Sequence, residues 1–244
     1  AIDRNGKVVV NINCNEPRDV GNGYMIVVKD NRFSSLYNPN GTKIFGVEGG
    51  ISYLSDGLLS FSRSKDGKRL HGYIDLQGNI VVAPIYYGAG AASNGMVIVE
   101  DQNHERLLLN VSKQTTVSLP DTVEVNALGG NRILVQNKRG IYGYLNTLGK
   151  QAIAYKFNYA EPFRYQAALV KTKSGYNLVN ESGKFLLEPQ GYGLYLGHGV
   201  YGFAKSVTAA LNLYDGKGRL ILPNVIDMNG WHNGYFSVST RVKS

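Results

Sequence analysis

The chain repeats itself about every 35 residues along its whole length. A glycine that follows a short polar turn and precedes an apolar run recurs at intervals of 34 to 37 residues: Gly6, Gly41, Gly78, Gly149, Gly183 and Gly218, with Gln114 in the fourth place. A second glycine follows after 16 or 17 residues: Gly23, Gly57, Gly95, Gly130, Gly199 and Gly234, with Gln166 in the fifth place. A fixed period of this size predicts stacked repeats, because one unit cannot bury its apolar face alone.

Each unit contains an apolar strand, a polar turn with the first glycine, and a second apolar strand. Glycine supplies the positive φ that such turns need. Aspartate or asparagine ends the first strand, as at Asp75, Asn110, Asn146, Asn180 and Asp215. Because amide and carboxylate alternate there, we interpret the position as a turn cap and not as an acid–base residue. Proline follows the turn position after five or six residues at Pro84, Pro120, Pro189 and Pro223, where its missing donor should end strand pairing.

The periodicity predicts one all-β repeat domain over residues 1–244, since no stretch has the pattern of a useful amphipathic helix. Its seven units lie approximately at 1–33, 34–70, 71–106, 107–141, 142–175, 176–210 and 211–244. Seven units of four short strands would close into a seven-bladed β-propeller, which protects the sheet edges. The alternative is an open, twisted β-rod of stacked hairpins.

Composition limits the partners. The 43% of hydrophobic residues suffice for a continuous core, and the formal net charge is +8. The basic residues form no long run, and the densest groups, Lys65–Arg69 and Lys138–Arg139, fall in predicted turns. We interpret the charge as a solvated surface, with a role in partner binding as the alternative, and we expect no specific nucleic-acid partner.

Membrane, disulfide and phosphate-loop features are not indicated. The single Cys14 excludes an internal disulfide, and no run of 18 apolar residues predicts a transmembrane segment. No signal peptide is seen in the given residues, and a removed targeting segment stays open. The glycine-rich stretches 21–23, 88–90 and 191–193 are interpreted as turns or bulges, because no helix is expected after them.

The titratable residues suggest no reaction. The histidines His71, His104, His198 and His232 lack the spacing of metal ligands, and the carboxylates are scattered. We therefore predict no catalytic residue, no metal and no cofactor, and we expect that the protein is not an enzyme.

The variable segment before each second glycine holds the candidate ligand-binding residues: Tyr86, Tyr159, Tyr192, Tyr195, Trp231 and His232. Aromatic faces stack on sugar rings, and Tyr and Trp dominate protein interfaces. The competing interpretation is that Tyr87, Tyr159 and Tyr192, nine or ten residues after the turn position, are packing residues shared between units. Trp231 and His232 belong to one unit alone, which favours a role in recognition.

Several segments resemble the WG repeat family of short bacterial β-repeats: Gly72-Tyr73-Ile74-Asp75, Gly143-Tyr144-Leu145-Asn146, Gly149-Lys150 and Glu161-Pro162-Phe163. The third, fifth and sixth units match closely, while His71 and Tyr142 stand where the family has tryptophan. The resemblance implies a non-enzymatic repeat protein, often secreted or in the bacterial cell envelope. We expect an interaction scaffold that binds a protein or peptide. The alternatives are a glycan-binding module that uses exposed tyrosines and Trp231, and, third, an enzyme on a propeller scaffold.

Overall fold

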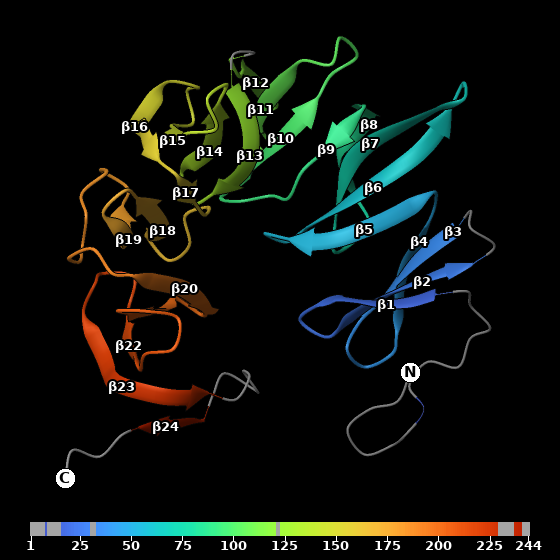
Figure 1. Ribbon diagram of the computed structural model, residues 1–244. Coiled ribbons are helices and arrows are strands. Elements are labelled where there is room, and N and C mark those ends of the chain that lie inside the picture. Colours follow the sequence, from blue (N-terminus) through green and yellow to red (C-terminus); the bar gives the residue numbers. More distant parts are fainter. Residues whose placement is uncertain (1–7, 9–15, 30–32, 121–122, 229–236, 241–244) are drawn as a thin grey trace. The chain divides into compact units, whose positions relative to one another are not determined.

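The computed structural model describes residues 8, 16–29, 33–120, 123–228 and 237–240 (Figure 1). The described residues form strands, turns and connecting segments, with no helix among them. They belong to two compact units, Ala1–Leu119 (unit 1) and Pro120–Ser244 (unit 2), and each unit is described by itself. The prediction of an all-β chain is confirmed.

Unit 1 contains three four-stranded antiparallel sheets whose strands pair in chain order. The first sheet holds β1 (Glu16–Gly21), β2 (Tyr24–Lys29), β3 (Phe33–Tyr37) and β4 (Lys43–Glu48). The second holds β5 (Gly50–Ser55), β6 (Leu58–Lys65), β7 (Lys68–Asp75) and β8 (Ile80–Tyr86). The third holds β9 (Gly88–Ala89), β10 (Met96–Glu100), β11 (Arg106–Asn110) and β12 (Thr115–Ser118).

Unit 2 follows the same plan with three further sheets. The first holds β13 (Val123–Gly129), β14 (Arg132–Asn137), β15 (Tyr142–Leu145) and β16 (Gln151–Phe157). The second holds β17 (Tyr159–Ala160), β18 (Ala167–Thr172) and β19 (Gly175–Asn180), and the bridges Tyr176–Gln190 and Val179–Phe185 extend it. The third holds β20 (Tyr192–Gly197), β21 (Val200–Ala204), β22 (Leu211–Tyr214), β23 (Leu220–Met228) and β24 (Val238–Thr240). Such meanders have the topology of propeller blades, so the chain is all-β and propeller-like.

The sheets straddle the sequence repeats. Each sheet begins with the turn that contains the second glycine of one repeat and ends with the turn that contains the first glycine of the next repeat. In the second sheet of unit 1, for example, Gly57 lies between β5 and β6, and Gly78 lies between β7 and β8. The six described sheets account for six such pairs in this way. The remaining pair, Gly6 and Gly234, lies outside the described residues.

The turns confirm why glycine recurs. The first glycine of each repeat, where it lies in the described part of the chain, has φ between +72° and +91°. The two residues that stand in for glycine adopt the same region, with φ of +53° at Gln114 and +73° at Gln166. The repeat is therefore a repeat of backbone conformation, which glycine satisfies at least cost.

The residue before each of these turns caps it, as the sequence predicted. The Asn146 Oδ1 atom accepts hydrogen bonds from the Leu148 and Lys150 amides at 2.9 and 3.0 Å. The Asp75 Oδ1 atom accepts from Gln77 and Asn79 at 2.9 and 2.8 Å. Asn180 and Asp215 repeat the pattern. Hydrogen bonds from the Asn79 side chain and from turn amides lower the pKa of the Asp75 carboxyl, which keeps it ionised as an acceptor.

The prolines correct one prediction. Pro84 lies within β8 and Pro223 within β23, so neither ends its strand. Pairing between β7 and β8 shifts register but continues to His71↔Tyr86 beyond Pro84. Strand β8 is an edge strand, which tolerates proline because its missing donor can face away from the ladder. Strand β23 lies between β22 and β24, and Pro223 falls in the register shift between the paired residues Leu222 and Val225.

The core lies between neighbouring sheets of each unit. Strand β18 shows this most simply, because all four residues 167–170 are buried. Ala168 and Val170 pack with Tyr144 and Phe157 of the preceding sheet, while Ala167 and Leu169 pack with Tyr201 and Phe203 of the following sheet. Because successive side chains of a strand point to opposite faces, β18 contributes side chains to two cores. Each sheet therefore depends on both of its neighbours for burial.

A buried tyrosine hydroxyl connects neighbouring sheets at two equivalent places. Tyr73 Oη donates to the Gly90 carbonyl and Tyr144 Oη donates to the Glu161 carbonyl, each at 2.7 Å and each 17 residues along the chain. The glycine before each tyrosine lies against the fourth strand of its own sheet. A Cβ atom at Gly72 would lie 2.3 Å from the Val82 carbonyl oxygen, and one at Gly143 would lie 3.0 Å from that of Ile153. The Gly-Tyr pair therefore serves two contacts at once.

We expect Tyr144→Phe to destabilise the fold by about 1–2 kcal/mol, because the Glu161 carbonyl loses its buried donor. Thermal unfolding should show a Tm lowered by roughly 2–4 °C per kcal/mol. Tyr155→Phe is the matched control, since Tyr155 is half-buried and makes no hydrogen bond through its hydroxyl in the described structure. Equal Tm values for the two variants would refute the role of the Tyr144 hydroxyl.

We expect Asn146→Ala to destabilise the β15–β16 turn by about 1 kcal/mol, because two turn amides lose their acceptor. Asn146→Asp should retain most of the stability, since Asp75 and Asp215 cap equivalent turns. Chemical denaturation of the three proteins measures both effects. An aspartate variant as unstable as the alanine variant would contradict the capping role.

Candidate functional site

Three of the six predicted site residues come together in unit 2: Tyr159 on β17, and Tyr192 and Tyr195 on β20. Tyr86 instead lies at the end of β8 in unit 1, half-buried against the core that contains Tyr73 and Val97. Burial, and then the charge of Asp101, raises the pKa of Tyr86. Trp231 and His232 lie outside the described residues.

A row of side chains crosses the sheet β17–β18–β19. Tyr159 pairs with Lys171, and Lys171 pairs with Tyr176, so the three side chains lie on the same face of the sheet. The Lys171 Nζ atom lies 4.6 Å from the centroid of the Tyr176 ring, and the Tyr159 and Tyr176 ring centroids are 6.4 Å apart. Tyr192 of the next sheet continues the row, with its ring 6.2 Å from Tyr176. We call these four residues the tyrosine row.

Edge-to-face ring contacts dominate the row, with interplanar angles of 62° and 65°. This geometry places the positive edge of one ring against the negative face of the next. The Lys171 ammonium adds a cation–π contact to Tyr176. Tyr159 is the most accessible member, with 41% of its surface exposed, while Lys171, Tyr176 and Tyr192 are half-buried.

An ion-pair network extends the row along the loop after β17. The Tyr159 hydroxyl donates to Glu161 Oε1 at 2.9 Å, and Arg164 Nη1 donates to Glu161 Oε2 at 2.8 Å. The Arg164 guanidinium lies 4.9 Å from the centroid of the Tyr195 ring. Tyr159 and Tyr195, which are far apart in sequence, are thus joined through one carboxylate and one guanidinium.

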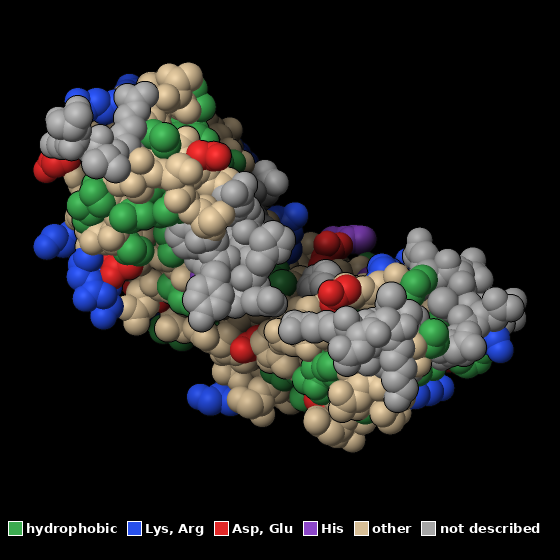
Figure 2. Space-filling model, turned by 90° about the horizontal axis from the view of Figure 1, so that it is seen from below, with side chains coloured by type: hydrophobic (Ala, Val, Ile, Leu, Met, Phe, Trp, Pro, Cys, Tyr) green, Lys and Arg blue, Asp and Glu red, His purple; other side chains and the backbone are tan. Residues whose placement is uncertain are grey.

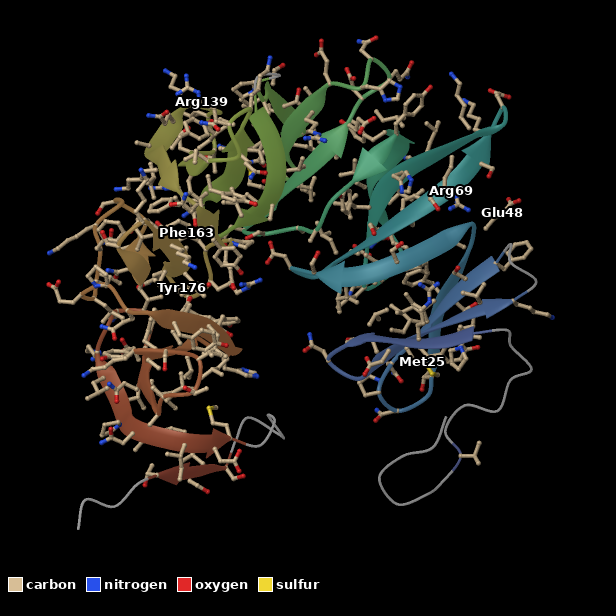
Figure 3. All side chains as sticks on the ribbon, viewed as in Figure 1. Met25, Glu48, Arg69, Arg139, Phe163 and Tyr176 are labelled. Atoms are coloured by element: carbon tan, nitrogen blue, oxygen red, sulfur yellow. The ribbon has the colours of Figure 1, made fainter. Side chains whose placement is uncertain are left out.

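Buried aromatic residues fix the backbone of this loop from the side of the core. The Tyr144 hydroxyl donates to the Glu161 carbonyl, and the Tyr201 hydroxyl donates to the Arg164 carbonyl at 2.8 Å. Phe163 lies between them in the chain and is buried (Figure 3). The centroid of its ring lies 4.9 Å from that of Tyr144. Burial is the main cause that raises the pKa of both Tyr144 and Tyr201, so both hydroxyls stay protonated as donors. The side chains of Glu161 and Arg164 are therefore presented by a fixed backbone.

The pKa of the Tyr159 phenol is also raised. Burial, the hydrogen bond to Glu161 and the charge of Glu161 together raise the pKa of Tyr159 to about 12. The phenol is protonated at neutral pH and donates to the carboxylate. The arrangement offers aromatic faces, two cationic side chains and hydrogen-bonding groups, which are the chemistry of recognition.

Sequence reasoning missed Lys171, Tyr176, Glu161 and Arg164. The antiparallel register of the hairpin 167–180 would have placed Lys171 beside Tyr176, because the pairing runs without a shift from Ala167↔Asn180 to Thr172↔Gly175. Nothing in the sequence indicated that Arg164 would lie over Tyr195, since that contact joins two different sheets.

The remaining titratable residues form no second centre in the described part of the chain. No group of three histidine, cysteine, aspartate or glutamate side chains there could hold a metal ion. Within the same residues, no helix is long and apolar enough to cross a membrane. On the face shown in Figure 2, lysine and arginine side chains are scattered, with acidic side chains among them.

Family comparison identifies two repeats. Residues 72–103 and 142–176 match the family model of the WG containing repeat, so these segments are WG repeats. Each matched segment contains a Gly-Tyr pair together with the carbonyl that accepts its tyrosine hydroxyl, at Gly90 or Glu161. The comparison with curated proteins gave no match.

A solved structure with a TM-score above 0.5 shows a likeness of the fold, and two others are reported beside it. The crystal structure of the eukaryotic initiation factor is similar, with 14% identity over 90% of this chain and 69% of that chain, and a TM-score of 0.56. The C-terminal WD40 domain of Sif2 matches with 12% identity, over 91% of this chain and 76% of that chain, with a TM-score of 0.43. The WD40 beta propeller domain of Doa1 matches with 14% identity, over 91% and 87%, with a TM-score of 0.39.

We expect Glu161→Gln to lower the pKa of Tyr159 from about 12 toward its ordinary value, because the variant removes a negative charge that favours the protonated phenol. The folded pKa is raised, so this phenol stabilises the fold below its unfolded pKa of about 10, and that contribution is lost as the pH rises through 12.

Ultraviolet titration of tyrosinate measures the shift, with Tyr159→Phe identifying the signal. Glu181→Gln makes the same change of charge elsewhere in unit 2 and should leave the Tyr159 signal in place. A Tyr159 signal that does not move in Glu161→Gln would contradict the coupling.

Proposed function

We propose that this protein is a non-enzymatic interaction scaffold that binds a protein or peptide at the bacterial cell envelope. The tyrosine row, with the adjoining Glu161–Arg164 pair, is the observation that carries the proposal. The resemblance to WG repeat proteins, which two segments of the chain match, is the ground on which we propose the envelope location.

The chemistry of the row supports a protein or peptide ligand. Tyrosine and arginine are enriched among the residues that dominate binding energy at protein interfaces. Here their positions are fixed before a partner arrives, because buried hydroxyls hold the loop that carries Glu161 and Arg164. Preorganisation of this kind reduces the entropy lost on binding.

A glycan ligand is the second candidate, and Tyr159 favours it. The residue is 41% exposed and lies beside a carboxylate that can accept hydrogen bonds and a guanidinium that can donate them. An aromatic face flanked by such groups suits a sugar ring, which stacks through its C–H face and hydrogen-bonds through its hydroxyls.

The test uses immobilised protein and extracts of bacterial envelopes, followed by affinity measurement with each identified partner. We expect Tyr159→Ala and Arg164→Gln to weaken binding about tenfold or more, because they truncate central residues of the surface. Leu148→Ala is the control, since Leu148 is 64% exposed on a turn of the same unit and lies outside the row. Thermal unfolding confirms that each variant is folded.

A partner that binds all variants equally would place the interface elsewhere and refute the tyrosine row. A glycan array run on the same proteins decides the second candidate. Glycan binding that is lost in Tyr159→Ala, without a protein partner, would replace the scaffold by a lectin-like module.

A further inference from the structure

A polar pocket in unit 1 lies beside the connection between β4 and β5. It has a volume of about 370 Å³ and is lined by Glu48, Gly49, Gly50, Ser62, Arg63, Ser64 and Arg69. Figure 3 shows Glu48 and Arg69 next to each other. We call it the Gly49 pocket. A water molecule occupies about 30 Å³ in the liquid, so the pocket is large enough for an organic ligand and not only for an ion.

The register gives the place of the pocket within the repeat. Gly50 pairs with Ser62 and Gly88 pairs with Glu100, so Gly49 and Tyr87 occupy equivalent places in neighbouring sheets. Tyr87 carries a ring there, and its centroid lies 5.4 Å from that of His104. At Gly49 there is no side chain, and none could be added without moving the chain. A Cβ atom would lie 1.9 Å from the Ser62 carbonyl oxygen, and φ is +112°.

Two arginines, Arg63 and Arg69, line the pocket together with one carboxylate, that of Glu48. The ion pairs of the described residues do not include Arg63 or Arg69. The Arg63 guanidinium lies 5.7 Å from the centroid of the Phe61 ring, in a cation–π contact. Burial is the main cause that lowers the pKa of the neighbouring His71, and the charge of Arg69 lowers it further.

The pocket also contains hydroxyls and a carboxylate, and the carboxylate would be unfavourable in a site for a bare anion such as phosphate. Ser62 and Ser64 supply hydroxyls that donate or accept, and Glu48 supplies a carboxylate that only accepts. A carboxylate on the wall repels a second negative charge but attracts hydroxyl donors. The set therefore matches a ligand with one anionic group and several hydroxyls.

We propose that the Gly49 pocket binds a small carboxylic acid that also carries hydroxyl groups, as a sugar acid does. Arg69 pairs with Ser64 and so lies on the same face of the β6–β7 hairpin as Ser62 and Ser64. It receives the ligand carboxylate, for which the planar guanidinium is well matched. Glu48 and the two serines receive the ligand hydroxyls. This site goes beyond the proposed scaffold function, since it uses no residue of the tyrosine row.

Titration calorimetry with D-glucuronate, D-glucose and inorganic phosphate tests the proposal. We expect the wild-type protein to bind D-glucuronate in the millimolar range and to bind glucose and phosphate at least tenfold more weakly. Arg69→Gln should weaken glucuronate binding about tenfold, since it removes a charged hydrogen-bond donor. Glu48→Gln should weaken glucuronate and strengthen phosphate, because it removes both the acceptor and the repulsion.

Lys65→Gln is the matched control, because Lys65 is exposed on the same β6–β7 hairpin and does not line the pocket. It makes the same change of charge and should leave glucuronate binding unchanged. No binding of glucuronate, equal binding of phosphate, or equal losses in Arg69→Gln and Lys65→Gln would each overturn the proposal. The protein-capture experiment above is independent of all three outcomes.

Discussion

The bond between a buried tyrosine hydroxyl and a carbonyl of the next sheet is the interaction on which much of this structure depends. Tyr73 and Tyr144 make it at equivalent places, and in each case the preceding glycine allows the fourth strand to approach. A phenol buried without a partner would cost free energy, so the bond fixes how far apart and in what register two sheets of a unit can stack. The two segments that match the WG containing repeat include this pair together with its acceptor.

The candidate surface of unit 2 is a consequence of that stacking. Tyr144 and Tyr201 hold opposite ends of the loop 161–164 from below, and Phe163 fills the space between them. The outward side chains, Glu161 and Arg164, then connect Tyr159 to Tyr195. Core packing and surface recognition are thus two sides of one loop, and a change beneath it is expected to reach the surface.

Variation between repeats creates what the repeats themselves do not supply. Tyr87 and Gly49 occupy the same place in neighbouring sheets, yet one carries a ring and the other lies in a pocket lined by two arginines. Tyr159 and Tyr192 likewise share a first-strand position that holds glycine in two sheets of unit 1. A constant backbone with changing side chains allows each sheet to present its own chemistry.

The sequence by itself determined the local structure, because turn conformation is decided within four or five residues. The glycine positions, the two glutamine substitutes and the caps at Asp75 and Asn146 were all predictable on that ground. The strands themselves followed from the same local pattern. Only the tertiary structure decided that the sheets straddle the repeats, that Pro84 lies inside an outer strand, and that Arg164 lies over Tyr195. Such features depend on how strands and sheets pack and pair, and no short window of sequence contains that information.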